Sequence, residues 1–331
     1  DAKPDGVEGG SWLFPLSAKT CIALEASVTR LADFAETMSE RDLASAAFTL
    51  QSGRRSYPHR LAVVAGSREE LARVLRKPRK TGNRTPNPKA SEVAFLFPGQ
   101  GLQFVGMAAS LYAVDAPFRE QIDNGLALLP GENGLIRDAI CGLPQAKGEE
   151  RSAMPTSIAQ PLLFLVEYTL AKRWIDLGVQ PSVLLGHSLG ELTAAAVAGV
   201  FRFEDGLQLA AIRGRLMQEM EEGAMLAVSL PVEGASRYVT EDIWIAAENG
   251  PKLTIVSGAP AAITELEQRL GAARVATMRL RTDRAFHSPQ MMEAAVRFKA
   301  AVAAVERGKP AIPWLSNSTG TCIKTEEAMS P

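Results

Sequence analysis

The segment LLGHSLGEL, residues 184–192, constrains the fold of this chain more than any other stretch. It places Ser188 between Gly186 and Gly190, after an apolar run that predicts a buried strand and before a pattern that predicts a helix. This is the pattern of a nucleophile elbow, a tight turn in which glycines let the flanking backbones approach closely. A helix-capping serine in a glycine-rich turn fits the same letters, since Ser is a common N-cap.

Length and composition exclude several classes of protein. A chain of 331 residues can bury a sizeable core and form more than one structural unit. Its hydrophobic fraction of 46% and charged fraction of 22% indicate a globular protein. The net charge of −1, with both signs interspersed, argues against nucleic acid or an anionic membrane as partner. No apolar run is long enough to cross a bilayer, and residues 1–10 lack the apolar core of a signal peptide.

The cysteines argue against both disulfides and a metal site. Cys21, Cys141 and Cys322 are odd in number and widely spaced, which matches neither a disulfide framework nor a metal-binding pattern. We therefore expect a cytoplasmic protein, in a reducing compartment, without a bound metal.

A serine becomes a good nucleophile only beside a base, and the chain has three histidines. His187 adjoins Ser188, but neighbouring side chains on an extended segment point in opposite directions, so it is badly placed to take the proton. His59 belongs to an earlier unit. His287 remains, in a loop expected between a strand and a helix, although its spacing alone favours an ordinary surface histidine.

A basic segment rich in proline, glycine and asparagine, residues 77–90, predicts a linker or exposed loop. The pattern before it predicts a small α/β unit, with strands at 12–16 and 60–65 and helices at 20–38, 41–50 and 67–75. The pattern after it predicts a larger α/β unit, with strands at 93–97, 183–185 and 314–316 and helices at 157–177, 189–199, 203–222 and 289–305. Pro161 is expected in the first turn of its helix, where a missing N–H costs little.

The pattern changes between the last two of those helices. Strands are expected at 225–230, 243–248, 254–257 and 275–280, and helices at 232–239 and 261–270. The order β-α-β-β-α-β is that of a ferredoxin-like split unit. We interpret it as a small subdomain inserted into the larger core.

Six motifs occur in order: FPGQG (97–101), QPLLFLVEYTLAKRW (160–174), GHSLGE (186–191), IRGRLMQ (212–218), AFHSPQM (285–291) and LSNSTG (315–320). Together they resemble the acyltransferase domains of modular polyketide synthases, which are related to malonyl-CoA:acyl carrier protein transacylases. The resemblance covers about residues 91–331. Two earlier segments, LFPLSAKT (13–20) and RLAVVAGS (60–67), resemble the small α/β linker domain between ketosynthase and acyltransferase.

The resemblance implies an α/β-hydrolase-like core with an inserted ferredoxin-like small subdomain, preceded by a small α/β linker domain. The expected parts are a disordered N-terminal segment (1–10), the ketosynthase–acyltransferase linker domain (11–90) and the acyltransferase domain (91–331). Within the last, 91–223 and 284–331 form the core and 224–283 the small subdomain. The chain is then a piece of a longer polypeptide, with a ketosynthase domain of that polypeptide and an acyl carrier protein as partners.

The resemblance also assigns roles at the site. It implies that Ser188 is the nucleophile, that His287 is its base, and that the backbone N–H groups of Gln100 and Leu189 form an oxyanion hole. The histidine of such a dyad is oriented by a backbone carbonyl in the segment matching Asn317, so no third acid is needed. The implied substrate is malonyl-CoA and the acceptor a carrier protein's phosphopantetheine, in a ping-pong reaction without a bound cofactor. The implied substrate-binding residues are Gln160, His187, Arg213, Phe286 and Asn317.

Arg213 decides the expected substrate class. Without the resemblance it reads as a surface arginine, like Arg215 nearby, but the family packs this helix beside the active site. A guanidinium fork binds a carboxylate through two parallel charge-assisted hydrogen bonds, each contributing ~1.5–3 kcal/mol net. That is enough to favour a dicarboxylic thioester over an acetyl one.

The extender unit rests on Phe286. Ala-Phe-His-Ser at this position resembles malonyl-selective enzymes, since a phenyl ring beside the substrate α-carbon takes the space of a methyl group; Leu189 fits the same assignment. One methylene discriminates by only ~1–3 kcal/mol. Arg284 departs from the histidine usual in malonyl-type sequences, and either faces solvent or reshapes the pocket. Methylmalonyl or another extender unit therefore stays open.

Two other functions remain as alternatives. A serine esterase or thioesterase would need an acid such as Asp242 or Asp283 on the base, and would not need Arg213. A non-enzymatic docking module suits the N-terminal unit. For the whole chain it is disfavoured, because the implied nucleophile, base, oxyanion-hole residue and arginine all occur together.

Overall fold

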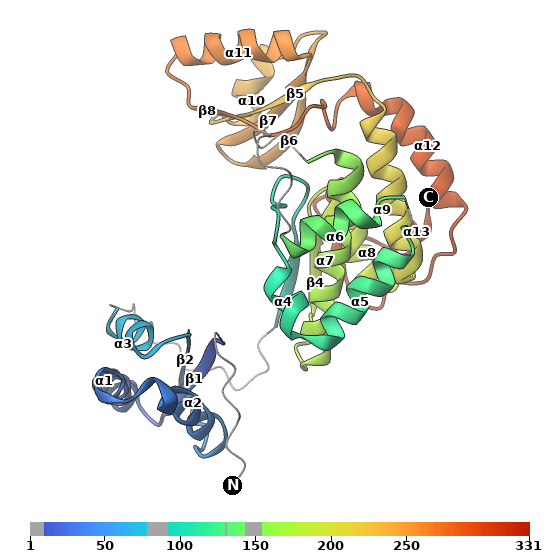
Figure 1. Cartoon of the computed structure of the whole chain (residues 1–331). Helices are drawn as coiled ribbons and strands as arrows, with labels where there is room; N and C mark the ends of the chain where they lie inside the picture. The colour runs from blue at the N-terminus through green and yellow to red at the C-terminus, as the bar shows by residue number, and fades with distance from the viewer. Residues whose placement is uncertain (1–9, 78–91, 130, 143–153) are drawn as a thin grey trace. The chain divides into compact units, whose positions relative to one another are not determined.

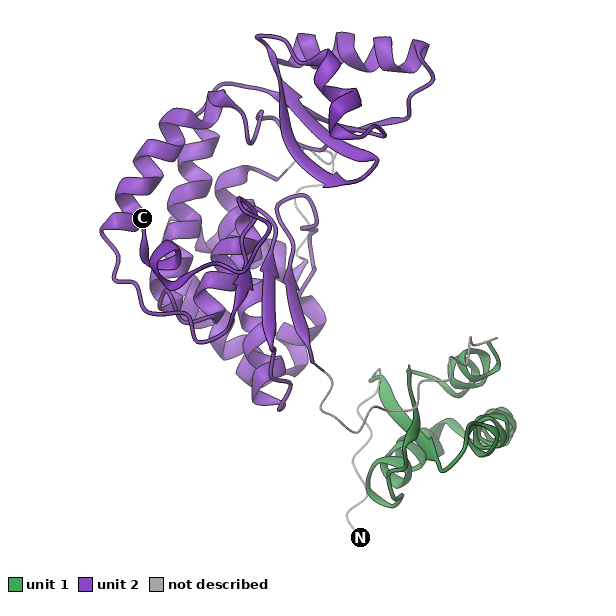
Figure 2. Cartoon of the chain, turned by 180° about the vertical axis from the view of Figure 1, so that it is seen from behind, with its two compact units in different colours: residues 1–91 green, residues 92–331 purple. Residues whose placement is uncertain are grey.

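The computed structural model describes residues 10–77, 92–129, 131–142 and 154–331. The chain divides into two compact units, residues 1–91 and 92–331 (Figures 1 and 2). The linker expected at 77–90 lies outside the described residues except for Lys77, and so does the N-terminal segment except for Gly10. Within the described ranges, no helix combines the length and the apolar character needed to span a bilayer.

The first unit packs helices against a two-stranded antiparallel sheet. Strand β1 (Trp12–Ala18) pairs along its whole length with β2 (His59–Ala65). The helices are α1 (Cys21–Thr37), α2 (Leu43–Ser52) and α3 (Arg68–Arg76), with a 3₁₀ turn at Glu40–Asp42. Helix α3 begins as its sequence predicts, because the Ser67 hydroxyl accepts a hydrogen bond from the Glu70 N–H at 3.1 Å.

The second unit is built on a parallel three-stranded sheet. Strand β4 (Val183–Gly186) lies between β3 (Ala94–Phe97) and β9 (Trp314–Leu315). The helices are α4 (Ala109–Val114), α5 (Ala116–Ala127), α6 (Asn133–Cys141), α7 (Thr156–Asp176), α8 (Leu189–Val197), α9 (Phe203–Gln218), α12 (Met292–Ala303) and α13 (Thr325–Met329), with a 3₁₀ turn at Pro289–Met291. The sequence pattern missed α4, α5, α6 and α13.

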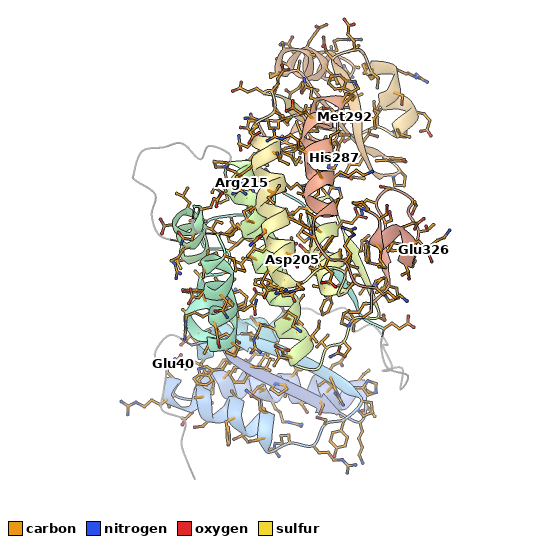
Figure 3. The ribbon with its side chains drawn as sticks, turned by 90° about the vertical axis from the view of Figure 1, so that its right-hand side faces the viewer. Glu40, Asp205, Arg215, His287, Met292 and Glu326 are labelled. Atoms are coloured by element: carbon orange, nitrogen blue, oxygen red, sulfur yellow. The ribbon has the colours of Figure 1, made fainter. Side chains whose placement is uncertain are left out.

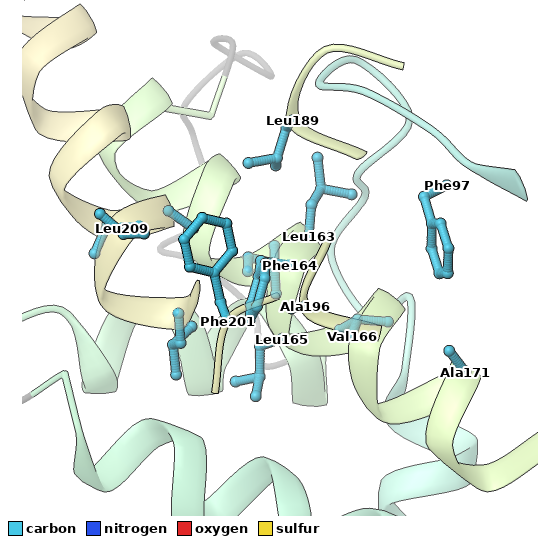
Figure 4. Close-up of a cluster of buried hydrophobic side chains, with 14 of the residues drawn as sticks. Phe97, Leu163, Phe164, Leu165, Val166, Ala171, Leu189, Ala196, Phe201 and Leu209 are labelled. Carbon is cyan, nitrogen blue, oxygen red and sulfur yellow. The ribbon is translucent and has the colours of Figure 1, made fainter. Parts of the chain in front are cut away.

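Helix α7 is the buried centre of this unit. Its residues Leu162, Leu163, Phe164 and Leu165 follow one another and are all at most 1% exposed, so this part of the helix is enclosed on every side. Figure 4 shows Leu163, Phe164 and Leu165 within the cluster, whereas Trp174, near the end of the helix, is 55% exposed. The expectation that Pro161 lies in the first turn is wrong. The helix begins at Thr156, so Pro161 falls in the second turn and leaves the carbonyl of Ser157 without its usual N–H donor.

A four-stranded antiparallel sheet forms a second lobe of this unit (Figure 1). Its strands are β5 (Ala224–Val228), β6 (Ile243–Gly250), β7 (Leu253–Gly258) and β8 (Thr277–Arg279), in the order β6-β7-β5-β8. Helices α10 (Val232–Ala235) and α11 (Pro260–Ala272) complete the lobe, with a 3₁₀ turn at Ser236–Tyr238. Leu226, Val256 and Ile263 lie at its core, where a side of α11 packs on the sheet.

Candidate active site

Ser188 occupies a sharp turn between the central strand β4 and helix α8. Its φ of 52° and ψ of −108° are unusual for a residue with a side chain. It stands at the N-cap position of α8, yet its hydroxyl makes no capping hydrogen bond. The structure therefore does not support the reading of Ser188 as a helix cap, and leaves its hydroxyl to other partners.

The two glycines of the motif are required by close backbone approach. A Cβ on Gly186 would lie 2.2 Å from the backbone nitrogen of Glu191, and one on Gly190 would lie 2.1 Å from the carbonyl oxygen of Phe97. Both distances are far inside van der Waals contact, so no side chain fits at either position. The glycines thus let β4, α8 and the end of β3 meet around Ser188.

His287 faces the Ser188 hydroxyl, with its Nε2 atom 3.1 Å from Oγ. It precedes α12, which packs beside α9, the helix of Arg215 (Figure 3). Burial lowers the pKa of His287 below its usual range, and the nearby Arg213 and His187 lower it further. The imidazole is thereby kept neutral, the form that accepts a proton. Among the described residues, its other nitrogen, Nδ1, has no hydrogen-bond partner.

Arg213 donates from Nη2 to Ser188 Oγ at 3.3 Å and from Nη1 to the Gln160 side-chain oxygen at 2.8 Å. Burial lowers the pKa of Arg213 to about 10, opposed by nearby Glu191, so the group stays charged at neutral pH. Within the described part of the chain it forms no ion pair. Arg215, by contrast, is 50% exposed and pairs with Glu132 at 2.9 Å. Arg213 is thus a half-buried cation that has Glu191 nearby but no carboxylate in ion-pair contact among the described residues.

Asn317 forms hydrogen bonds with the backbone of the turn that carries Ser188. Its Oδ1 accepts from the Ser188 N–H at 3.0 Å, its Nδ2 donates to the carbonyl of Gly186, and its backbone N–H donates to the Glu191 carboxylate at 2.8 Å. These contacts fix the Ser188 backbone and do not reach His287. Glu191 was not singled out from the sequence, although it stands in the same motif; burial raises its pKa, opposed by the Asn317 N–H and by Arg213.

The residues expected to form the oxyanion hole lie at the same edge of the sheet. Leu189 is the first residue of α8, and Gln100 follows β3. The backbone N–H groups of both donate to no acceptor among the described residues. The Gln100 side chain donates to the Thr156 hydroxyl at 3.0 Å, so it is held away from the backbone donor.

The other expected substrate-binding residues take different places. Gln160 is 1% exposed and lies between Arg213 and Met217, whose sulfur accepts from its amide at 3.3 Å. His187 lines the cleft beside Ser188. Phe286 instead packs in an apolar cluster, among Met217 and Met291, and lines neither cavity described below.

Two cavities meet at Arg213 and His287. The larger, about 930 Å³, lies between the core and the four-stranded sheet, because Ser188, Asn317 and residues 246–249 of β6 all line it. The smaller, about 280 Å³, is open and mostly apolar. Besides Arg213 and His287 it is lined by Met217, Ser288, Met291, Met292, Ala294, Ala295 and Phe298.

Neither acid that a hydrolase triad would need reaches the base. The Asp283 carboxylate accepts from Gln218 at 3.4 Å and pairs with Arg284 at 3.1 Å, and no contact joins Asp242 to His287. In the described ranges no cluster of three or more His, Cys, Asp or Glu side chains could bind a metal ion.

Arg284 meets neither of its two expectations. Its side chain is only 11% exposed, so it does not face solvent, and it lines neither cavity. It donates from Nη2 and Nε to the carbonyl of Gln218 at 2.8 and 3.3 Å, and from Nη1 to the carbonyl of Asp283 at 2.9 Å. The guanidinium therefore forms hydrogen bonds within the protein, because the carbonyl group of Gln218 at the end of α9 has no N–H donor from the helix itself.

Comparison with known proteins matches both units to families. A family model described as the acyl transferase domain matches residues 94–329, and one described as the CurL-like C-terminal region of polyketide synthases matches residues 12–75. A phenolphthiocerol/phthiocerol polyketide synthase protein of Mycobacterium tuberculosis is 34% identical over 97% of this chain and 22% of its own length. Erythronolide synthase EryA2 of Saccharopolyspora erythraea is 35% identical over 83% of this chain and 8% of its own. The chain thus spans less than a quarter of these relatives.

Solved structures agree. The acyl transferase domain of SpnD, in complex with 2-(pent-4-yn-1-yl)malonyl, is 32% identical with a TM-score of 0.82, over 97% of this chain and 76% of that chain. The acyl transferase domain of ZmaA is 32% identical with a TM-score of 0.80, over 99% and 77%. The malonyl-CoA:ACP transacylase of Synechocystis sp. PCC 6803 is 29% identical with a TM-score of 0.61, over 72% and 80%.

Proposed function

Because the chain belongs to the acyl transferase domain family of polyketide synthases, we propose that it moves an acyl unit from an acyl-CoA thioester, through Ser188, to the phosphopantetheine thiol of a carrier protein. One observation carries the proposal: a single hydroxyl has both an imidazole, at 3.1 Å, and an unpaired guanidinium, at 3.3 Å, within hydrogen-bond reach. A base activates a serine, and a cation beside it selects an anionic substrate.

In the first half-reaction, His287 Nε2 takes the proton of Ser188 as Oγ bonds to the thioester carbonyl carbon. The backbone N–H groups of Gln100 and Leu189 stabilise the oxyanion, helped by the N-terminal dipole of α8. The carbon–sulfur bond then breaks, and coenzyme A leaves as a thiol with the proton that His287 returns. The product is an acyl ester of Ser188.

In the second half-reaction, the phosphopantetheine thiol gives its proton to His287 while its sulfur bonds to the ester carbonyl carbon. The carbon–oxygen bond to Ser188 breaks, and Oγ regains the proton. The two thioesters use the site in turn, so one base and one oxyanion hole serve both steps.

Arg213 supports a dicarboxylic substrate. Its guanidinium has no ion-pair partner among the described residues, and a carboxylate on the acyl group would supply one through a bidentate contact. One similar structure is a complex with an alkyl-substituted malonyl group and another is a malonyl-CoA:ACP transacylase, and both acyl groups carry such a carboxylate. The malonyl group is therefore the first candidate.

Intact-protein mass spectrometry after mixing with malonyl-CoA or acetyl-CoA tests this proposal. We expect a malonyl adduct on the wild type, none on Ser188→Ala, and a loss of malonyl loading of ~10-fold or more in Arg213→Ala, which removes a charge-assisted contact. Arg215→Ala is the matched control, since Arg215 is exposed and pairs with Glu132. Wild-type rates of malonyl loading in Arg213→Ala would exclude the carboxylate contact.

The smaller cavity favours a second candidate, an extender unit with an alkyl group on its α-carbon. The malonyl preference expected from Phe286 assumes that its ring occupies that space, but the ring packs in the core. The apolar cavity of about 280 Å³ borders both Arg213 and His287, and the flexible Met217 and Met291 line it.

Competition among malonyl-, methylmalonyl- and longer alkylmalonyl-CoA separates the two candidates. Ala295→Leu narrows the smaller cavity from an exposed position of α12, and Ala300→Leu makes the same change outside both cavities. Under the second candidate, only Ala295→Leu lowers the loading of alkylmalonyl groups relative to malonyl. Exclusive loading of malonyl by the wild type would support the first candidate.

We also propose fold assignments for the two lobes of the second unit, from their resemblance to acyltransferase domains. The order β6-β7-β5-β8 of the antiparallel sheet supports a ferredoxin-like small subdomain at 224–283, and the parallel sheet with the Ser188 turn supports an α/β-hydrolase-like core. A carrier protein and a ketosynthase domain of the same polypeptide are the proposed partners. Measuring transfer to a phosphopantetheinylated carrier protein against release to water distinguishes this function from a thioesterase.

A further inference from the structure

Two chain segments cross between the core and the four-stranded sheet, and they contact each other. Residues 219–223 leave α9 for the sheet, and residues 280–286 return from it towards His287. Glu222 and Arg284 form an isolated antiparallel bridge, and the Gly223 N–H donates to the Asp283 carbonyl at 2.9 Å. A Cβ on Gly223 would lie 2.3 Å from the nitrogen of Ala285, so the segments are as close as backbones can be.

Arg284 fastens the returning segment to the end of α9. Its guanidinium donates twice to the carbonyl of Gln218, the last residue of that helix, and once to the carbonyl of Asp283. A cation is favoured at a helix C-terminus, where carbonyl groups lack N–H donors. Because the side chain is nearly buried, water competes little for these bonds.

The residue that Arg284 binds is itself tied to two other parts of the site. The Gln218 side chain accepts from the Thr156 N–H at 2.7 Å and donates to the Asp283 carboxylate at 3.4 Å. The Thr156 hydroxyl in turn accepts from the Gln100 side chain at 3.0 Å. A continuous path of hydrogen bonds therefore runs from the loop after β3, through the start of α7 and the end of α9, to the segment that carries His287.

We propose that Arg284 is a positioning residue, which holds His287 opposite Ser188 and Arg213 by locking the returning segment onto the carbonyl of Gln218. His287 lies three residues after Arg284, and Arg213 lies on α9, the helix whose last carbonyl group Arg284 binds. His287 has a φ of 58°, a conformation that persists only where its surroundings impose it. The inference rests on the proposed function for the substrate, but the alignment of His287 with Ser188 concerns any reagent that acylates or phosphonylates the serine.

The test compares Arg284→Ala with Arg281→Ala, an exposed arginine of the same segment without a contact among the described residues. Two rates are measured on the full chain: labelling of Ser188 by a fluorophosphonate, which needs the base but no carboxylate, and malonyl loading. We expect Arg284→Ala to lower the labelling rate and kcat together by ~10–100-fold, as small misplacements of a catalytic group do, with KM for malonyl-CoA unchanged. Arg284→Lys keeps a cation but not the fork, so intermediate rates are expected.

Labelling and loading rates of Arg284→Ala that equal those of Arg281→Ala overturn the inference. If Arg284→Ala does not fold, the same comparison is made with Arg284→Lys at an unchanged melting temperature: lower rates support the inference and equal rates overturn it. A wild type that reacts with the fluorophosphonate but does not load malonyl contradicts the proposed substrate, and the labelling rates alone then decide the role of Arg284. A wild-type Ser188 that does not react with the probe overturns both.

Discussion

At the level of single residues, the candidate site contains two residues with strained backbone conformations. Ser188 and His287 both have positive φ values, and among the described residues only one other residue with a side chain, Arg274, does. Such conformations cost ~1–3 kcal/mol each and persist where neighbours hold them. Asn317 and the motif glycines hold the backbone of Ser188, and Arg284 makes its contacts three residues before His287. The strain at both partners of one hydrogen bond indicates that their mutual position is what the surroundings maintain.

The pH dependence of serine reactivity follows from the environment of His287. The groups that face it are Arg213 on α9 and His187 on the Ser188 turn, and with burial they lower its pKa. Because the neutral imidazole is the base, labelling of Ser188 should stay fast at neutral pH and fall only below the ordinary histidine pKa of 6.5. Arg213→Met removes a positive charge, so the acid limb should move to higher pH.

The measurement is the fluorophosphonate labelling rate across the range of about pH 5 to 8, where histidine titrates. Arg215→Met, which changes an exposed arginine on the same helix, is expected to leave the limb in place. An acid limb that stays put in Arg213→Met would contradict the electrostatic contribution assigned to Arg213.

At the level of secondary-structure elements, two glycines in helices differ in the space around them. Gly190 on α8 abuts the carbonyl of Phe97, whereas Gly271 on α11 has nothing within 4 Å of a built Cβ. Gly190→Ala should lower the free energy of unfolding by ~1–3 kcal/mol or more, as overpacking does. Gly271→Ala should raise it by up to ~1 kcal/mol, because alanine favours helix. Urea unfolding of both variants checks the pair; equal effects would refute the close approach at the turn.

The contact between α7 and α8 contains a buried acid, Glu167, which accepts a hydrogen bond from Thr193 at 2.8 Å. Burial raises the pKa of Glu167 from 4.5 to about 8. Between these two pH values the carboxyl group is protonated in the folded chain and ionised in the unfolded chain. The contribution of Glu167 to the free energy of unfolding is fully present below pH 4.5 and is lost as pH rises from there through about 8. Glu167→Gln should flatten this part of the stability profile, and unfolding free energies across that range measure it. Glu265→Gln, on the exposed side of α11, should leave the profile unchanged.

At the scale of the whole molecule, each compact unit has a hydrophobic core of its own. Residues such as Phe14 and Leu71 form the core of the first unit, and Phe118, Leu162 and Leu184 belong to that of the second. Every residue assigned a role in the reaction lies in the second unit. The two units therefore meet the basic requirement for folding separately.

A chain of residues 92–331 is accordingly expected to fold and to keep the labelling rate of Ser188 within about twofold of the full chain, since this unit has its own core and holds every residue assigned a role. Near-ultraviolet circular dichroism and the labelling rate test this expectation. Loss of labelling in a folded fragment would show that the first unit contributes to the site.

Local patterns were sufficient for the elements that carry the site. Two glycines around Ser188, an apolar run before it and a helical pattern after it predict the turn between β4 and α8, because the determinants lie within a few residues of one another. The family resemblance is likewise confirmed by the matched domain models. Helices α4, α5 and α6 were missed for different reasons. Helix α4 has only six residues and no buried residue, so its sequence carries no helical signal. In α5, by contrast, the buried Phe118, Ile122 and Leu126 repeat at helical spacing, so this helix could have been predicted.

The family, the serine turn and the three histidines from which a base could come could all be read from the amino-acid sequence. The family resemblance implied that His287 and Arg213 act at Ser188, but their contacts with its hydroxyl are seen only in the folded chain. The packing of Phe286 in an apolar cluster and the contacts of Arg284 between two segments were not expected from the sequence. The difference lies in the distance along the chain over which each signal acts. Turn and helix signals act between near neighbours, whereas the meeting of groups far apart in sequence depends on how whole elements pack.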